Sequence, residues 1–310
     1  KGIHGAILSY LSLKKENFYM VENTVDGKFF VTARGWEDLS EILKSYEELQ
    51  VEIGEELIGE FLQKEEIARD FAGYYRLYEK YKSDYQIQEI LDGNVTSGQL
   101  KTCCDMGKKA SFEERFTVTE MLLEAVTERI SVFQKTDEKT EKLYENLKLL
   151  KIFLQEKNSV EAMEQFVASR RKALDAKICS ELLTAEEAAR EEEQIRILEE
   201  YFFQLKELHI SDVAEGIEQI GERFGNVCRL RNEKLEETKK MLEQAFSFLE
   251  ECFGEGQELL LFETGLTGDD RCSIFISQYG CPSYFKHCEL LLYSKKENEL
   301  RKECRDLLEE

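Results

Sequence analysis

Arg34 is the side chain in this sequence whose type and position best suit it to bind an anion. It follows Thr32, whose hydroxyl group can cap a helix, and it precedes Trp36, the only tryptophan of the chain. A guanidinium group stays charged and offers a planar set of N–H donors that matches phosphate oxygens. At the start of a helix its position is fixed, and the backbone amides add positive potential. The alternative is an ordinary ion pair with Glu37 or Asp38.

A zinc site is the second chemistry that the residue types suggest, and the spacing argues against it. Four candidate ligands lie near the C-terminus: Cys272, Cys281, His287 and Cys288. They lack the paired Cys-x-x-Cys spacing of structural zinc sites, and the adjacent His287 and Cys288 would point to different sides of a helix. We therefore expect no metal site here, and buried thiols instead.

The adjacent residues Cys103 and Cys104 raise the question of redox chemistry. We expect them in a loop beside Asp105, where only Lys101 and Lys108 stand near enough in sequence to lower a thiol pKa. A redox sensor is therefore the weakest of the functions considered. The chain has nine cysteines, an odd number with irregular spacing, which is typical of free thiols in a reducing compartment and favours the cytoplasm.

Neither a catalytic triad nor an anion-binding basic patch is evident. The histidines are His4, His209 and His287, and none combines with a serine or cysteine and a carboxylate in a defensible triad. We therefore expect no catalytic residues. Two short basic runs, 170–172 and 229–231, are better explained as solvated or paired with glutamates than as anion-binding.

Charge and composition limit the possible partners. The formal net charge of −22 would repel nucleic acid, and it fits either a well-solvated surface or a docking surface for a basic partner. No apolar run approaches the roughly 20 residues that a membrane-spanning helix needs. A single proline, Pro282, favours long unbroken helices.

The N-terminal third predicts short helices around one β-hairpin. The expected elements are a helix over 3–13, strands over 18–21 and 28–31 with a turn at Asp26-Gly27, and helices beginning at Thr32, Glu55 and Glu65. The last of these, over 65–91, carries Tyr74, Tyr78, Tyr81 and Tyr85 on one face. That stripe predicts a packed core face, with a partner-binding face as the alternative.

Long helices are predicted after a glycine-rich break at 92–110. Capping boxes at 111–114 and 184–187 begin two of them, Thr136-Asp137 is expected to begin another, and a return helix is expected over 212–253. Short helices are expected over 259–266, 272–279, 283–293 and 296–308. The fold class is thus mainly α, in four segments: a lid-like segment 1–66, a tyrosine-rich helix and loop 67–110, long antiparallel coiled-coil-like arms 111–255 and a helical bundle 256–310.

The stretch from Ile7 to Leu43 resembles the lid region of MoxR-type AAA+ ATPases. In that family a Ser/Thr-x-Arg element opens the helix that carries the second sensor arginine, and Thr32-Ala33-Arg34 followed by Gly35-Trp36 matches it. Tyr10-Leu11 and Asn17-Phe18-Tyr19 resemble the approach to that element. The resemblance covers about the first 65 residues, whereas Gly-x-x-x-x-Gly-Lys-Ser/Thr occurs nowhere in the sequence.

The resemblance implies that the chain is the C-terminal part of such an ATPase, and that the catalytic half lies upstream. Arg34, supported by Thr32 and Trp36, would sense the γ-phosphate of ATP, and the lid would rotate in response. The parent would hydrolyse ATP with magnesium, form a ring, typically a hexamer, and remodel or mature a client protein such as one with a von Willebrand A-type domain. The fragment itself would be non-catalytic and hold no cofactor. The alternative is a stand-alone helical scaffold with a coiled-coil docking hairpin.

Overall fold

The structure, a computed structural model, describes residues 2–24, 27–154 and 158–292. Its described residues form a mainly α fold with one antiparallel two-stranded sheet, as the sequence predicts. The chain divides into two compact units, Lys1–Ile130 with Lys239–Glu310, and Ser131–Thr238. Helices α7 (Phe112–Phe153) and α10 (Val213–Phe253) each contribute to both units. The finer division into four segments stays a prediction.

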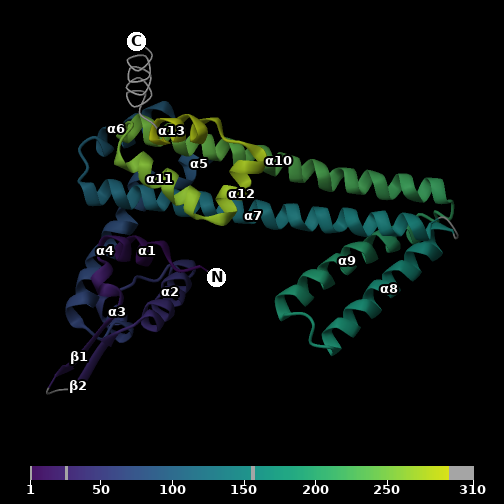
Figure 1. Cartoon of the computed structure of the whole chain (residues 1–310), viewed down its shortest axis with the longest axis horizontal. Helices are drawn as coiled ribbons and strands as arrows, with labels where there is room; N and C mark the ends of the chain where they lie inside the picture. Colours follow the sequence, from purple (N-terminus) through teal and green to yellow (C-terminus); the bar gives the residue numbers. More distant parts are fainter. Residues whose placement is uncertain (1, 25–26, 155–157, 293–310) are drawn as a thin grey trace, which may run out of the picture. The chain divides into compact units, whose positions relative to one another are not determined.

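The first unit begins with short elements (Figure 1). In chain order they are α1 (Gly5–Leu13), the 3-10 turn η1 (Lys15–Phe18), β1 (Met20–Thr24), β2 (Gly27–Val31), α2 (Ala33–Glu48), α3 (Glu55–Phe61), α4 (Glu65–Tyr85), α5 (Ile87–Asp92) and α6 (Ser97–Gly107). The predicted hairpin is confirmed, although β1 begins two residues later than expected, and Met20 pairs with Val31. Asp26 of the predicted turn lies outside the described residues.

Aromatic side chains form the core where α1, α2 and α4 meet. Tyr10, Trp36 and Phe71 are all buried, and the Phe71 ring lies 5.2 Å from each of the other two rings. Edge-to-face contacts of this kind stabilise a core beyond the area that they bury. The packing therefore fixes the first turns of α2 against α1 and α4.

The predicted helix over 65–91 is interrupted at Gln86. Its backbone takes the left-handed conformation with φ 50°, so that α4 ends at Tyr85 and α5 starts at Ile87. Of the predicted tyrosine stripe, Tyr78 and Tyr85 are buried, whereas Tyr74 and Tyr81 are half-buried. The Tyr85 hydroxyl donates to Glu114 at 2.8 Å.

One prediction in this unit is wrong. The break predicted over 92–110 contains helix α6 at Ser97–Gly107, which begins with a complete capping box between Thr96 and Gln99. Cys103 and Cys104 are consequently buried in a helix rather than exposed in a loop. Their helix packs closely on α10, because a Cβ atom on Gly107 would lie 2.8 Å from the Phe253 ring.

The C-terminal helices of the first unit follow the prediction. They are α11 (Gln257–Gly268), α12 (Asp270–Tyr279) and α13 (Pro282–Leu292). Pro282 is the first residue of α13, where its missing N–H costs no helical hydrogen bond. The predicted helix over 296–308 lies outside the described residues.

The second unit contains an antiparallel hairpin of α8 (Ser159–Cys179) and α9 (Ala185–Glu207), and parts of α7 and α10 (Figure 1). Its core is a cluster of buried apolar side chains that includes Leu143, Phe166 and Leu198. The capping box at Thr184 and the long helix α10 are confirmed. A helix start at Thr136 is wrong, because α7 continues through it and the Thr136 hydroxyl donates to the Val132 carbonyl.

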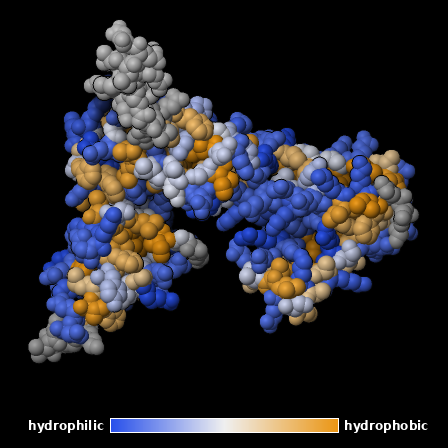
Figure 2. All heavy atoms as spheres, in the orientation of Figure 1, coloured by the Kyte–Doolittle hydropathy of each residue, from blue (hydrophilic) through white to orange (hydrophobic). Residues whose placement is uncertain are grey.

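Hydrophilic and hydrophobic residues alternate over the face shown in Figure 2. Within the described part of the chain, no helix combines the length and the apolar character needed to cross a membrane.

Candidate functional site

The first turn of α2 is built by the residues on both sides of Arg34. Strand β2 ends at the buried Val31, and Thr32 then takes an extended backbone with φ −137°. The Thr32 hydroxyl accepts a hydrogen bond from the Gly35 N–H at 3.2 Å. This is the N-cap that the sequence predicts, and it satisfies one of the free amides of the first turn.

Gly35 and Trp36 hold this turn against the body of the unit. A Cβ atom on Gly35 would lie 2.7 Å from the Phe61 carbonyl oxygen, so only glycine allows α3 to approach this closely. Trp36 is 2% exposed, and its Nε1–H donates to the Asn17 carbonyl at 3.3 Å. The residue types at these positions are therefore set by packing.

Arg34 points away from that packing. Its side chain is 79% exposed, and its Nε–H donates to the Asp38 carboxylate at 3.1 Å, one turn later in the same helix. The ion pair considered in the sequence analysis is thus present with Asp38. An exposed pair of this kind contributes little, roughly 0.3–0.5 kcal/mol, so the guanidinium can be drawn to another anion at small cost. The proposed sensing role stays a prediction.

The site can therefore do one kind of chemistry, which is to present a rigidly mounted cation and a helix N-terminus to an anion. Known proteins do not identify it further. No protein-family model, curated protein or solved structure matched the chain.

The four zinc candidates do not come together as a site. Cys272 contacts the Thr127 hydroxyl at 3.5 Å, Cys281 contacts the Glu243 carboxylate at 3.3 Å, and Cys288 is half-buried. Burial raises the pKa of Cys272 to about 11, and burial together with Glu243 raises the pKa of Cys281 to about 12. Both are buried thiols, as expected. Across the described residues, no group of three or more His, Cys, Asp or Glu side chains could hold a metal ion.

His287 and the short basic runs also find acidic partners. The buried His287 Nε2 lies 2.5 Å from the Glu250 carboxylate. Arg171 pairs with Glu199, and Arg229 pairs with Glu233. Each basic run thus contains an arginine that pairs with a glutamate, and Arg231 of the second run pairs with Asp137.

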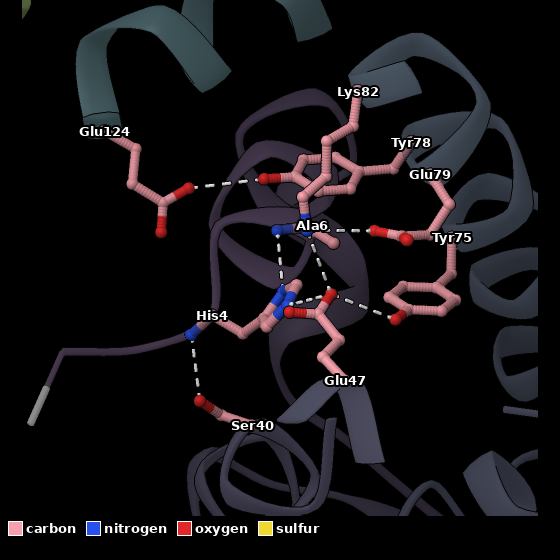
Figure 3. Close-up of polar contacts among 9 residues, drawn as sticks. All are labelled: His4, Ala6, Ser40, Glu47, Tyr75, Tyr78, Glu79, Lys82 and Glu124. Atoms are coloured by element: carbon pink, nitrogen blue, oxygen red, sulfur yellow. Dashed lines mark hydrogen bonds and ion pairs between the residues drawn. The ribbon is translucent and has the colours of Figure 1, made fainter. Parts of the chain in front are cut away.

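A buried polar network around His4 is the feature that sequence reasoning missed (Figure 3). The His4 backbone N–H donates to Ser40 at 2.8 Å, and the imidazole Nδ1 accepts from the Ala6 N–H at 3.1 Å, which caps α1. Because Nδ1 is an acceptor, the proton is on Nε2, which donates to Glu47 at 3.0 Å. His4 thus connects the start of α1 to the middle and the end of α2.

Glu47 is the common acceptor of this network (Figure 3). Besides His4, it accepts from the Tyr75 hydroxyl at 3.2 Å and pairs with Lys82 at 3.5 Å. Burial alone would raise the Glu47 pKa, but the hydrogen bond from His4, the charge of Lys82 and the Tyr75 hydroxyl together lower it to about 2. The carboxylate is therefore held in its ionised form.

The opposite end of the network is a second half-buried carboxylate. The Tyr78 hydroxyl donates to Glu124 on α7 at 3.3 Å, and burial raises the pKa of Glu124. A Cβ atom on Gly5 would overlap the Glu124 carboxylate, so a larger residue there would displace this side chain. Ser40 bonds the His4 backbone rather than the imidazole, whose two nitrogens contact Ala6 and Glu47. We therefore interpret the network as the polar support that fixes α1, α2, α4 and α7.

Proposed function

We propose that the chain is the C-terminal lid and helical interaction region of a MoxR-type AAA+ ATPase, and that Arg34 reads the nucleotide. One observation carries the proposal. In the element Thr32–Trp36, packing accounts for the capping threonine, the close-contact glycine and the anchoring tryptophan. Arg34 is held in a rigid turn, yet it has only an exposed ion pair.

In the proposed reaction the parent binds ATP with magnesium between its nucleotide-binding half and this lid. The Arg34 guanidinium leaves Asp38 and donates to γ-phosphate oxygens, a stronger charge-assisted interaction. Hydrolysis removes that partner, and the lid rotates because its position depended on the contact. The ring of parent subunits then transmits the rotation to a cytoplasmic client, a protein with a von Willebrand A-type domain being our first candidate.

The test uses the full-length ATPase that contains this chain. Losing hydrogen bonds to a charged phosphate costs about 1.5–3 kcal/mol, so Arg34→Ala should lower kcat for ATP hydrolysis about 10- to 100-fold. Arg34→Lys should rescue poorly, because an ammonium lacks the planar fork. Arg69→Ala is the matched control, since Arg69 is also exposed and ion-paired in the same unit. Unchanged hydrolysis in Arg34→Ala would refute the proposal.

A second candidate function, a helical scaffold with a docking hairpin, is favoured by the tip of the α8–α9 hairpin. Ile178 is 49% exposed and Leu182 is 72% exposed at this tip, where hydrophobic residues gather in Figure 2. The DNA upstream of the codon for Lys1 separates the two functions. A phosphate loop and an apolar strand ending in Asp-Glu there support the ATPase, whereas a start codon directly before Lys1 supports the scaffold.

A further inference from the structure

Two buried thiols from distant parts of the first unit face each other. Cys104 lies in α6 and Cys252 lies in α10, 148 residues later, and their Sγ atoms are 2.6 Å apart. Cys104 is 7% exposed and Cys252 is 2% exposed. A disulfide needs an S–S distance of about 2 Å, so bond formation requires a movement of less than about 1 Å.

The neighbouring thiols are directed elsewhere. Cys103 is also buried, but its Sγ faces the carbonyl oxygens of Asp84 at 3.9 Å and Tyr85 at 3.8 Å. Cys272 contacts Thr127 through its sulfur. The juxtaposition is thus specific to Cys104 and Cys252, and adjacency in sequence does not decide which thiol is placed for pairing.

Close backbone packing keeps the pair together. At the end of α6, a Cβ atom on Gly107 would lie 2.8 Å from the Phe253 ring and 3.6 Å from the Cys252 Cβ. The absence of a side chain at Gly107 therefore lets α6 lie directly on α10 beside the two sulfurs. No rearrangement of either helix is needed to bring the thiols into reach.

We propose that Cys104 and Cys252 are a modification site, at which hydrogen peroxide forms a reversible disulfide that locks α6 onto α10. Cys104 reacts first because it is the more exposed. Its thiolate attacks one peroxide oxygen, the S–O bond forms, the O–O bond breaks, and the released hydroxide takes up a proton to give water. The product is a sulfenic acid on Cys104.

The second step closes the bond. Cys252 loses its proton and attacks the Cys104 sulfur, so the S–S bond forms and the S–O bond breaks. The released hydroxide takes up that proton, which gives a second water. Two thiols are oxidised and one peroxide is reduced to two waters. Burial, with the contact to Cys104, raises the pKa of Cys252, so this second step is slow. Because both thiols are buried, bulky oxidants reach the pair poorly.

The experiment treats the full chain with hydrogen peroxide, blocks remaining thiols with N-ethylmaleimide and maps tryptic peptides by mass spectrometry. We expect a cross-linked peptide pair that contains Cys104 and Cys252, lighter by two hydrogen atoms than the separate peptides and lost after dithiothreitol. Cys103→Ser should retain the cross-link, which assigns it to Cys104 although both thiols share one tryptic peptide. Cys272→Ser is a second control and should also retain it.

Cys104→Ser and Cys252→Ser should each abolish the cross-link. The oxidised wild type should melt at a higher temperature than the reduced form, and the two variants should lose this difference, because the bond closes a long loop in the unfolded chain. If a variant folds poorly, the wild-type peptide and the Cys103→Ser result decide. A cross-link through Cys103, or blocking of both thiols by N-ethylmaleimide after peroxide treatment, would overturn the proposal.

Discussion

Replacing Glu47 by alanine should remove the centre of the polar network beneath α1 and α2. The change leaves the His4 Nε2–H and the Tyr75 hydroxyl without an acceptor, at side chains that are 7% and 5% exposed. A buried donor that loses its only partner costs about 1–3 kcal/mol. Lys82 adds little, since its side chain is 51% exposed.

The expected loss of unfolding free energy for the two donors is therefore about 2–6 kcal/mol. Glu47 itself is 27% exposed, so water can reach part of the vacated space and the lower half of this range is the better expectation. Glu47→Gln separates charge from hydrogen bonding. Its amide oxygen can still accept from His4 and Tyr75, so the loss should be about 1 kcal/mol.

Urea titration followed by tryptophan fluorescence measures this effect locally. Trp36 is the only tryptophan of the chain and is buried in the same helix as Glu47, so its emission reports the unfolding of this part of the first unit. Glu48→Ala is the matched control, an exposed residue at the end of the same helix, and should change stability by less than about 0.5 kcal/mol. If Glu47→Ala is no less stable than Glu48→Ala, the network does not support the fold.

Two further predictions use the same assay. The Glu47 pKa falls from 4.5 to about 2 on folding, so its contribution to stability is complete above about pH 4.5 and is lost as the pH falls towards 2. The wild type should therefore lose stability over this window more steeply than Glu47→Gln. Parallel pH profiles of the two proteins would contradict the assignment. Gly35→Ala should cost about 1–3 kcal/mol of stability, because its Cβ would meet the Phe61 carbonyl oxygen. The control Gly73→Ala in α4 has open space around the new methyl group and should be neutral or stabilising by up to about 1 kcal/mol. Equal effects of the two substitutions would show that α3 moves away easily.

Local signals predicted most of the helices. The capping box Thr184–Glu187 and the apolar periodicity of 212–253 located α9 and α10, because caps and periodicity act within a few residues. The errors arose where a local signal was misread. Thr136 can cap a helix, but in α7 its hydroxyl bonds back to Val132 and the helix continues. Thr96 and Gln99 form a capping box that begins α6, although glycine and polar residues around it favour a loop.

Contacts between distant residues could not be predicted from one sequence. His4 and Glu47 are 43 residues apart, and Cys104 and Cys252 are 148 apart. Neither pair leaves a spacing signature, because packing of whole helices brings them together. The break at Gln86 could not be predicted either, because its left-handed backbone falls on a glutamine rather than on a glycine or proline. A histidine directly before an apolar helical run was the one available hint of the His4 cap.

The element Thr32–Trp36 shows how structure sharpens a motif that the sequence only suggests. The Thr-x-Arg motif alone does not show which of its residues serve packing. In the structure, a hydrogen bond or a close approach inside the unit explains Thr32, Gly35 and Trp36. No such packing contact explains Arg34, and its ion-pair partner Asp38 is itself 46% exposed. The capped first turn of α2 fixes the backbone position of Arg34. The weak ion pair leaves its guanidinium able to bind another anion. Under the proposed function, Arg34→Ala should therefore leave stability unchanged while it lowers the rate of ATP hydrolysis by the full-length ATPase.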